Sequence, residues 1–244
     1  MSRLILCLGM HRSGTSVIAG CLPSLGASLG DRAQWGGPDN PNFNEDTNFL
    51  HLDDEILRRL RMRWDTLGPI DPAVWSSPLL DDLRLLVAPS LLKRRLTRWP
   101  VFAVKEPRLC RLLPFWRPLL AGIDVAIVHV IRHPSAVAAS LHHRNGIALP
   151  AALDLWADHV EAQFRDVDPA WKTVTMDYDG FLAGPGTSMK HIADALGLKL
   201  DLRTAKAFRH DVMKPSLRHH EASEIALPER VAVAWRVARG TMDA

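Results

Sequence analysis

Residues 4–16 read LILCLGMHRSGTS, an apolar run that leads directly into a loop with glycines at positions 9 and 14. The run 4–8 is too short and too apolar to be an amphipathic surface helix, so it predicts a buried strand. After the loop, apolar residues recur at helical spacing and predict a helix (Val17, Ile18, Cys21 and Leu22). A strand, a glycine loop and a helix in this order are typical of a parallel α/β sheet that binds a ligand at the ends of its strands.

The loop has the chemistry of an anion-binding turn. Gly9 and Gly14 are five residues apart, the spacing at which successive backbone N–H groups can surround a phosphate. Thr15 stands where a nucleotide triphosphatase has its lysine, which argues against a grip on a γ-phosphate. The cation is Arg12, inside the loop, where a guanidinium can form two parallel hydrogen bonds to a phosphate or a sulfate.

Further apolar runs predict three more strands, over residues 101–104, 125–131 and 173–176. Apolar residues three and four apart predict helices over residues 47–60, 79–96, 150–164, 188–196, 202–208 and 228–237. The alternation of strands and helices predicts an α/β protein with a three-layer P-loop-like fold, in which helices flank a central parallel sheet. The chain has 244 residues, 47% of them hydrophobic, so we expect residues 1–244 to form one domain.

Two of the later strands end in basic residues. Lys105 follows the run 101–104, and Arg132 follows the run 125–131. Ser140 comes eight residues after Arg132, and Pro134 is well placed to open the helix that would carry it. Arg132 and Ser140 could therefore reach one phosphate, although Ser140 on its own is explained equally well as a small packing residue.

These motifs together resemble those of the sulfotransferases. The loop GMHRSGTS resembles their 5'-phosphosulfate loop, Arg132 with Ser140 resembles their 3'-phosphate site, and Lys105 resembles their lysine that touches the phosphosulfate. Residues 178–182 (YDGFL) are similar to a segment of bacterial members. The resemblance implies transfer of the sulfuryl group of 3'-phosphoadenosine 5'-phosphosulfate (PAPS) to a hydroxyl, leaving 3'-phosphoadenosine 5'-phosphate (PAP). It also implies a nucleotide site formed by Met10, His11, Arg12, Ser13, Gly14, Thr15, Ser16, Lys105, Arg132 and Ser140.

Arg12 and Lys105 are expected to act in catalysis as well as in binding. Sulfuryl transfer builds negative charge on the oxygens between the sulfate and the 5'-phosphate, and the two cations could stabilise that charge. The monoanionic sulfuryl group does not require a magnesium clamp, so no metal is expected.

The base that removes the acceptor's proton has three candidates. The mammalian cytosolic branch has a catalytic histidine two residues past the lysine, and this chain has Pro107 there. We favour Glu45, which follows the Pro- and Asn-rich loop 36–44 and resembles the catalytic glutamate of bacterial and Golgi-type sulfotransferases. A first-turn acid that only complements a helix dipole would look the same. Glu106 and His11 are the alternative bases.

Composition limits the partners. Thirty Lys and Arg against 27 Asp and Glu give a formal net charge of +3, so nucleic acid is not an expected partner. The basic runs 58–63 and 93–98 are interpreted as solvated helix faces. The three cysteines have apolar neighbours and no metal-binding spacing, which indicates buried thiols in a reducing compartment, the cytoplasm.

We read residues 4–8 as a strand rather than as a secretion signal, and no apolar run is long enough to span a membrane. The acceptor stays open: a carbohydrate hydroxyl is suggested by the resemblance alone, and the oligomeric state is unknown. Two other functions fit part of the pattern. One is a P-loop small-molecule kinase with Asp177 as its magnesium ligand, and the other is a non-catalytic nucleotide-binding protein.

Overall fold

Four parallel strands form one sheet in the order β2-β1-β3-β4. They are β1 (Arg3–Leu8), β2 (Val101–Lys105), β3 (Asp124–Ile131) and β4 (Lys172–Asp177). The structure, a computed structural model, describes residues 2–31, 44–212, 222 and 226–242. The four predicted strands are confirmed to within one residue at either end, and so is the α/β fold with a central parallel sheet. The expected loop 36–44 lies outside the described residues, apart from Asn44.

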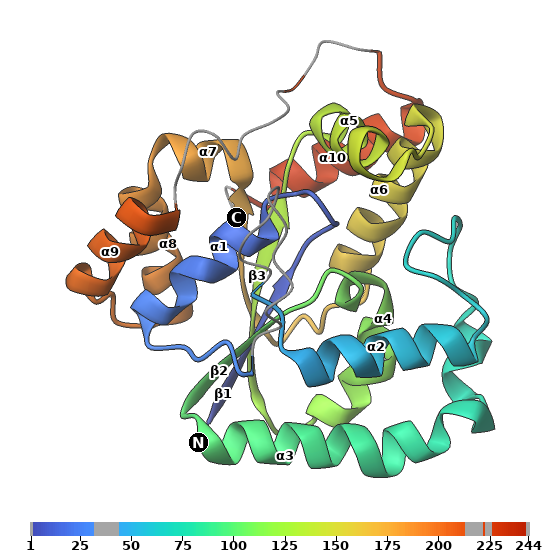
Figure 1. The fold of residues 1–244 in the computed structure, drawn as a ribbon, viewed down its shortest axis with the longest axis horizontal. Helices are drawn as coiled ribbons and strands as arrows, with labels where there is room; N and C mark the ends of the chain where they lie inside the picture. Colours follow the sequence, from blue (N-terminus) through green and yellow to red (C-terminus); the bar gives the residue numbers. More distant parts are fainter. Residues whose placement is uncertain (1, 32–43, 213–221, 223–225, 243–244) are drawn as a thin grey trace.

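Helices cover both faces of the sheet because the side chains of β1 alternate between two apolar layers. Leu4, Leu6 and Leu8 pack toward α2 (Thr47–Arg59), α3 (Ala88–Arg98) and α4 (Leu109–Trp116). Ile5 and Cys7 pack toward α1 (Thr15–Cys21), α8 (Pro185–Leu196) and α9 (Leu202–Val212). Figure 1 shows the first three helices below and to the right of the sheet and the last three to its left.

A third layer of helices packs near the carboxyl end of the sheet. It consists of α5 (Pro134–Asn145), α6 (Leu149–Arg165) and α10 (Glu229–Gly240), which surround Met10 and Ile131 (Figure 1). The short helix α7 (Tyr178–Ala183) follows β4 directly. None of the described helices combines the length and the apolar character that crossing a membrane requires.

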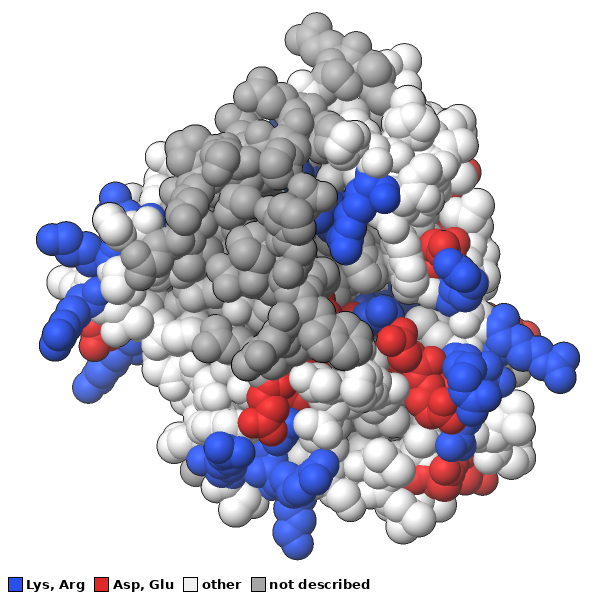
Figure 2. Space-filling model, in the orientation of Figure 1, with Lys and Arg blue, Asp and Glu red and all other residues white. Residues whose placement is uncertain are grey.

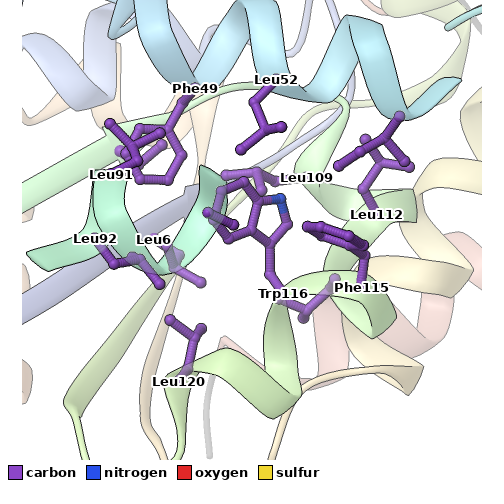
Figure 3. Packing of buried hydrophobic residues seen from close by; sticks show 14 of the residues in the cluster. Leu6, Phe49, Leu52, Leu91, Leu92, Leu109, Leu112, Phe115, Trp116 and Leu120 are labelled. Carbon is purple, nitrogen blue, oxygen red and sulfur yellow. The ribbon is translucent and has the colours of Figure 1, made fainter. Parts of the chain in front are cut away.

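Trp116 lies at the centre of the layer formed by α2, α3 and α4. Its ring stacks on Phe49 of α2 with 5.0 Å between ring centroids. Figure 3 shows leucines of the sheet and of the neighbouring helices around the two rings, among them Leu6, Leu52, Leu91 and Leu109. This packing ties α2 and α4 to each other and to the sheet, and both helices begin beside residues predicted to act in catalysis.

Most of the helices match the apolar spacing of the sequence, with three exceptions. The expected helix 79–96 is interrupted, because a 3₁₀ turn (Pro78–Leu80) and a π-helical turn (Leu83–Val87) precede α3. Pro89, which has no backbone N–H, lies in the first turn of α3 and accounts for the irregular start. The other two exceptions are α4 and α7, which the sequence analysis did not predict. The residues of α4 are buried on nearly every side, and α7 has only six residues, too few to show a helical repeat.

Charged side chains gather in small mixed groups on the surface. Figure 2 shows Lys and Arg in separate groups, several of them beside Asp or Glu. Arg58 and Arg59 pair with Glu55, as expected for a solvated face. The same interpretation of the run 93–98 is wrong at Arg95, which is only 5% exposed.

Arg95 is buried because it binds the residue that starts α2. Its Nη2 lies 2.8 Å from Oδ2 of Asp46, whose side chain is fully buried. Oδ1 of Asp46 accepts hydrogen bonds from the backbone N–H groups of Asn48 (3.0 Å) and Phe49 (3.4 Å), which is an N-cap. Asp46 therefore fixes the point where α2 begins, one residue after Glu45.

Replacing Asp46 by alanine is expected to lower the free energy of unfolding by about 3 kcal/mol or more, because the change removes a cap and a fully buried carboxylate and leaves the buried Arg95 to the half-exposed Asp31, 2.8 Å from its Nη1. Asp46→Asn keeps a capping oxygen and should cost less. Urea denaturation measures both. Arg98→Ala is the control: Arg98 is 64% exposed and 3.7 Å from Asp31, so its loss should cost about 0.5 kcal/mol or less. Equal losses in Asp46→Ala and Arg98→Ala would contradict the anchoring role.

Candidate active site

The loop between β1 and α1 turns through two residues in the left-handed region of backbone space, Arg12 with φ of 69° and Gly14 with φ of 85°. Gly14 also lies against the ring of Tyr178, since a Cβ at this position would be 1.9 Å from the ring atom Cδ2. Only glycine fits both conditions. The hydroxyl of Ser13 is buried in this loop, and among the described residues it has no hydrogen-bond partner. An unsatisfied buried hydroxyl in such a turn is consistent with a ligand as its partner.

The structure brings Arg12, Arg132 and Ser140 together. Nε of Arg12 donates a hydrogen bond to Oγ of Ser140 (2.8 Å), and Nη1 of Arg132 donates to the carbonyl oxygen of Arg12 (3.2 Å). Ser140 lies on the second turn of α5, and Arg132 follows β3. The chain leaves β1 toward β2 and leaves β3 toward β4 on the other side, so the three residues meet at the crevice where a parallel sheet binds ligands.

Tyr178 holds this cluster from the side of β4, a role that the sequence analysis missed. The guanidinium carbon of Arg132 lies 4.6 Å from the centre of the Tyr178 ring, a cation–π distance. Oδ2 of Asp179 is 4.0 Å from Nε of Arg132. The sequence of the segment 178–182 shows its resemblance to bacterial sulfotransferases, but its contacts with Gly14 and Arg132 depend on the tertiary fold.

The other residues predicted for the nucleotide site occupy the same loop and the first turn of α1. Met10 is buried among the third helix layer. Thr15 is buried as the first residue of α1, and Ser16 is half-buried beside it. The carbonyl oxygen of Ser16 accepts a hydrogen bond from Nδ2 of Asn44 (2.8 Å), which connects this turn to the segment that carries Glu45.

Lys105 and Glu45 form a buried ion pair. Nζ of Lys105 lies 2.6 Å from Oε1 of Glu45, and the two side chains are 2% and 6% exposed. Lys105 ends β2, where it pairs in register with Cys7 of β1. The favoured base and the lysine expected to stabilise the developing charge are thus in direct contact at the carboxyl edge of the sheet.

A cleft of about 250 Å³ opens beside this ion pair. It contains Glu45 and His11, two of the three candidate bases, whereas Glu106 is absent from its described lining. Trp64 and Leu141 give it apolar walls. The full set of lining residues is His11, Arg12, Glu45, Leu50, Asp54, Trp64, Arg108, Leu141, Arg144 and Asn145.

His11 is held as a neutral imidazole. Burial lowers the pKa of His11 well below its ordinary value, and the positive charge of Arg108 lowers it further. Its ring packs against Trp64 at 4.6 Å between centroids, and Nε2 is buried without a hydrogen-bond partner among the described residues. A histidine with so low a pKa is a weak base at neutral pH.

Glu106 is fully buried behind the cleft. Burial raises the pKa of Glu106 to about 7, while Arg108 opposes the rise and Glu45 adds to it. The carboxyl group bonds to Arg108 through both of its oxygens. A base must be reachable by the acceptor whose proton it takes, and Glu106 is fully buried.

Gly14→Ala is expected to cost about 3 kcal/mol or more in stability, because it adds backbone strain to a clash with Tyr178. Gly26→Ala isolates the strain: Gly26 has φ of 80° and nothing within 4 Å of an added Cβ, so about 1–2 kcal/mol is expected. Chemical denaturation measures both losses. Similar losses in both variants would show that Tyr178 does not constrain the loop.

No family model and no curated sequence matches the chain. Solved structures do match it along nearly its whole length. The sulfotransferase domain from the Synechococcus PCC 7002 olefin synthase has a TM-score of 0.57 at 16% identity, over 97% of this chain and 94% of that one. The sulfotransferase domain from the curacin biosynthetic pathway has a TM-score of 0.58 at 12% identity, over 98% of each chain.

Retinol dehydratase, solved in complex with androsterone and inactive cofactor PAP, matches 98% of this chain and 79% of its own with a TM-score of 0.42 at 15% identity, which is too distant to inform the site. The two sulfotransferase domains match this chain in the arrangement of strands and helices. At identities this low, the matches do not test the roles of single residues. The chain has the fold of the sulfotransferase domains.

Proposed function

We propose that this chain is a sulfotransferase that moves the sulfuryl group of PAPS to the hydroxyl of an acceptor. The observation that carries the proposal is the convergence of Arg12, Lys105, Arg132 and Ser140 at the carboxyl ends of β1, β2 and β3. Three of these residues are cations, and PAP carries phosphates at two positions. Charge-assisted hydrogen bonds of this kind are among the strongest that a protein forms to a phosphate.

The residues divide between the two ends of the nucleotide. Arg132 and Ser140 would hold the 3'-phosphate, and the loop with Arg12 would hold the 5'-phosphosulfate. The backbone N–H groups of the loop and the hydroxyl of Ser13 would add neutral donors. Lys105 would take up the charge that grows on the leaving phosphate.

Glu45 remains the favoured base. It lines the cleft, whereas Glu106 lies behind it, and the weak basicity of His11 fits a packing role better. A carboxylate next to Lys105 can accept the acceptor's proton while the ammonium group faces the departing phosphate. We keep a carbohydrate hydroxyl as the proposed acceptor and the cytoplasm as the proposed location.

The kinase alternative is less well supported. Asp177, its candidate magnesium ligand, caps α7 and accepts a hydrogen bond from the backbone N–H of Gly180 (2.7 Å). That role in capping accounts for the aspartate without a metal. A titration of ATP with magnesium beside PAP without magnesium separates the two functions.

PAP is expected to bind with micromolar affinity or tighter in the presence of a metal chelator. Arg132→Ala should weaken binding by about 10- to 100-fold, because a phosphate charge loses a guanidinium. Ser140→Ala should weaken it by about fivefold, because one neutral donor is lost. Calorimetry measures all three affinities, with thermal unfolding as the control for folding. Absence of binding at millimolar PAP would overturn the proposed function, and unchanged affinity in Arg132→Ala would place the 3'-phosphate elsewhere.

Glu45→Gln is expected to lower single-turnover sulfuryl transfer by about two orders of magnitude or more, the usual worth of a positioned base. PAP affinity should stay the same or increase, since Lys105 no longer faces a carboxylate. The measurement compares rates at saturating PAPS on one fixed panel of sugar and phenol acceptors. An active Glu45→Gln beside an inactive Glu106→Gln or His11→Ala would move the base to one of those residues and leave the sulfotransferase proposal intact.

A further inference from the structure

Two carboxyl groups, those of Asp53 and Glu106, lie fully buried against each other. Asp53 comes from the middle of α2 and Glu106 from the connection between β2 and α4, and each residue is 0% exposed. Their side chains are joined by a hydrogen bond. Ionised carboxylates only accept hydrogen bonds, so this contact requires a proton on one of the two groups.

The surroundings offer little else to neutralise the pair. Nε1 of Trp116 donates to Oδ1 of Asp53 (2.8 Å), and its indole nitrogen points toward α2 in Figure 3. Oδ2 of Asp53 is buried and has no described N–H donor. Arg108 bonds Glu106 through its backbone N–H (3.0 Å) and its Nη1.

Arg108 cannot balance two ionised groups here, because it has another acidic neighbour. Nε of Arg108 lies 2.9 Å from Oδ1 of the exposed Asp54, close enough for an ion pair but without the geometry of a hydrogen bond. Two buried carboxylates with one shared cation would leave a net charge in a medium where unpaired charge is very costly. Other described groups that act electrostatically on this cluster are Glu45 before α2 and Cys110 on α4, which act on Glu106, and His11 and His159, which act on Arg108.

We infer that Asp53 and Glu106 share one proton at neutral pH and act as a positioning pair that fixes the guanidinium of Arg108 in the wall of the cleft. Arg108 lines the cleft with Glu45 and His11. The direction of the pKa values agrees: burial raises that of Asp53 well above its ordinary value and that of Glu106 to about 7. The consequence for the acceptor rests on the proposed function, whereas the shared proton does not.

The shared proton is tested by the pH dependence of stability, because the folded pair keeps a proton that the unfolded chain releases above about pH 4.5. The stabilisation that the shared proton gives the wild type, relative to Asp53→Asn, is therefore fully present below that pH. It is lost as the pH rises toward the pKa of the folded pair. The ratio of unfolding constants, wild type over Asp53→Asn, should rise by up to about tenfold per pH unit between pH 4.5 and about 7.

Asp54→Asn is the matched control, since it removes an exposed carboxylate from the same turn of α2 and should keep the wild-type pH dependence. A ratio that is flat or falls with pH would overturn the inference. If Asp53→Asn does not fold, infrared spectra of the wild type decide: the band of a protonated carboxyl group should persist at pH 7, and its absence would overturn the pair. Neither measurement needs nucleotide, so a failure of PAP to bind would count against the proposed function alone.

The positioning role is tested with Glu106→Gln, which should raise the KM for the acceptors of the panel about tenfold with PAP affinity unchanged. Loss of PAP affinity to the same degree would show that the pair supports the whole site rather than Arg108.

Discussion

Gly14 has no room for a side chain, and the arrangement of the site depends on that constraint. Its positive φ turns the loop at the end of β1, and the ring of Tyr178 lies against it. The same ring packs on the guanidinium of Arg132, which in turn bonds the carbonyl of Arg12. A single close contact therefore couples the loop after β1 to the segments after β3 and β4.

A second constraint is electrostatic. Lys105 and Glu45 are buried together at 2.6 Å, and such a pair is costly to desolvate but still more costly to break. An anionic ligand at the end of β2 could compete with Glu45 for the ammonium group, which would release the Glu45 carboxylate toward the cleft that it lines. In the proposed function, donor binding and release of the base are then linked through one lysine.

The sheet and most helices could be predicted from the sequence because short apolar runs and helical spacing are local signals. The strand ends of a parallel sheet meet at one edge, so Arg12, Lys105 and Arg132 could also be expected to lie close together. The buried carboxyl pair could not be predicted, because Asp53 looks like one more polar residue of an amphipathic helix. The burial of Arg95 could not be predicted for the same reason. A basic run predicts a solvated face, and only the fold reveals the buried Asp46 beside Arg95.

The central claim is that the ends of β1, β2 and β3 form one site for an adenosine nucleotide with phosphates at both ends. A crystal structure of the chain with PAP bound tests it most directly. The account predicts the 3'-phosphate on Arg132 and Ser140 and the 5'-phosphate within residues 9–16, next to Lys105. A nucleotide bound away from the loop, or with its phosphates on other residues, would contradict it.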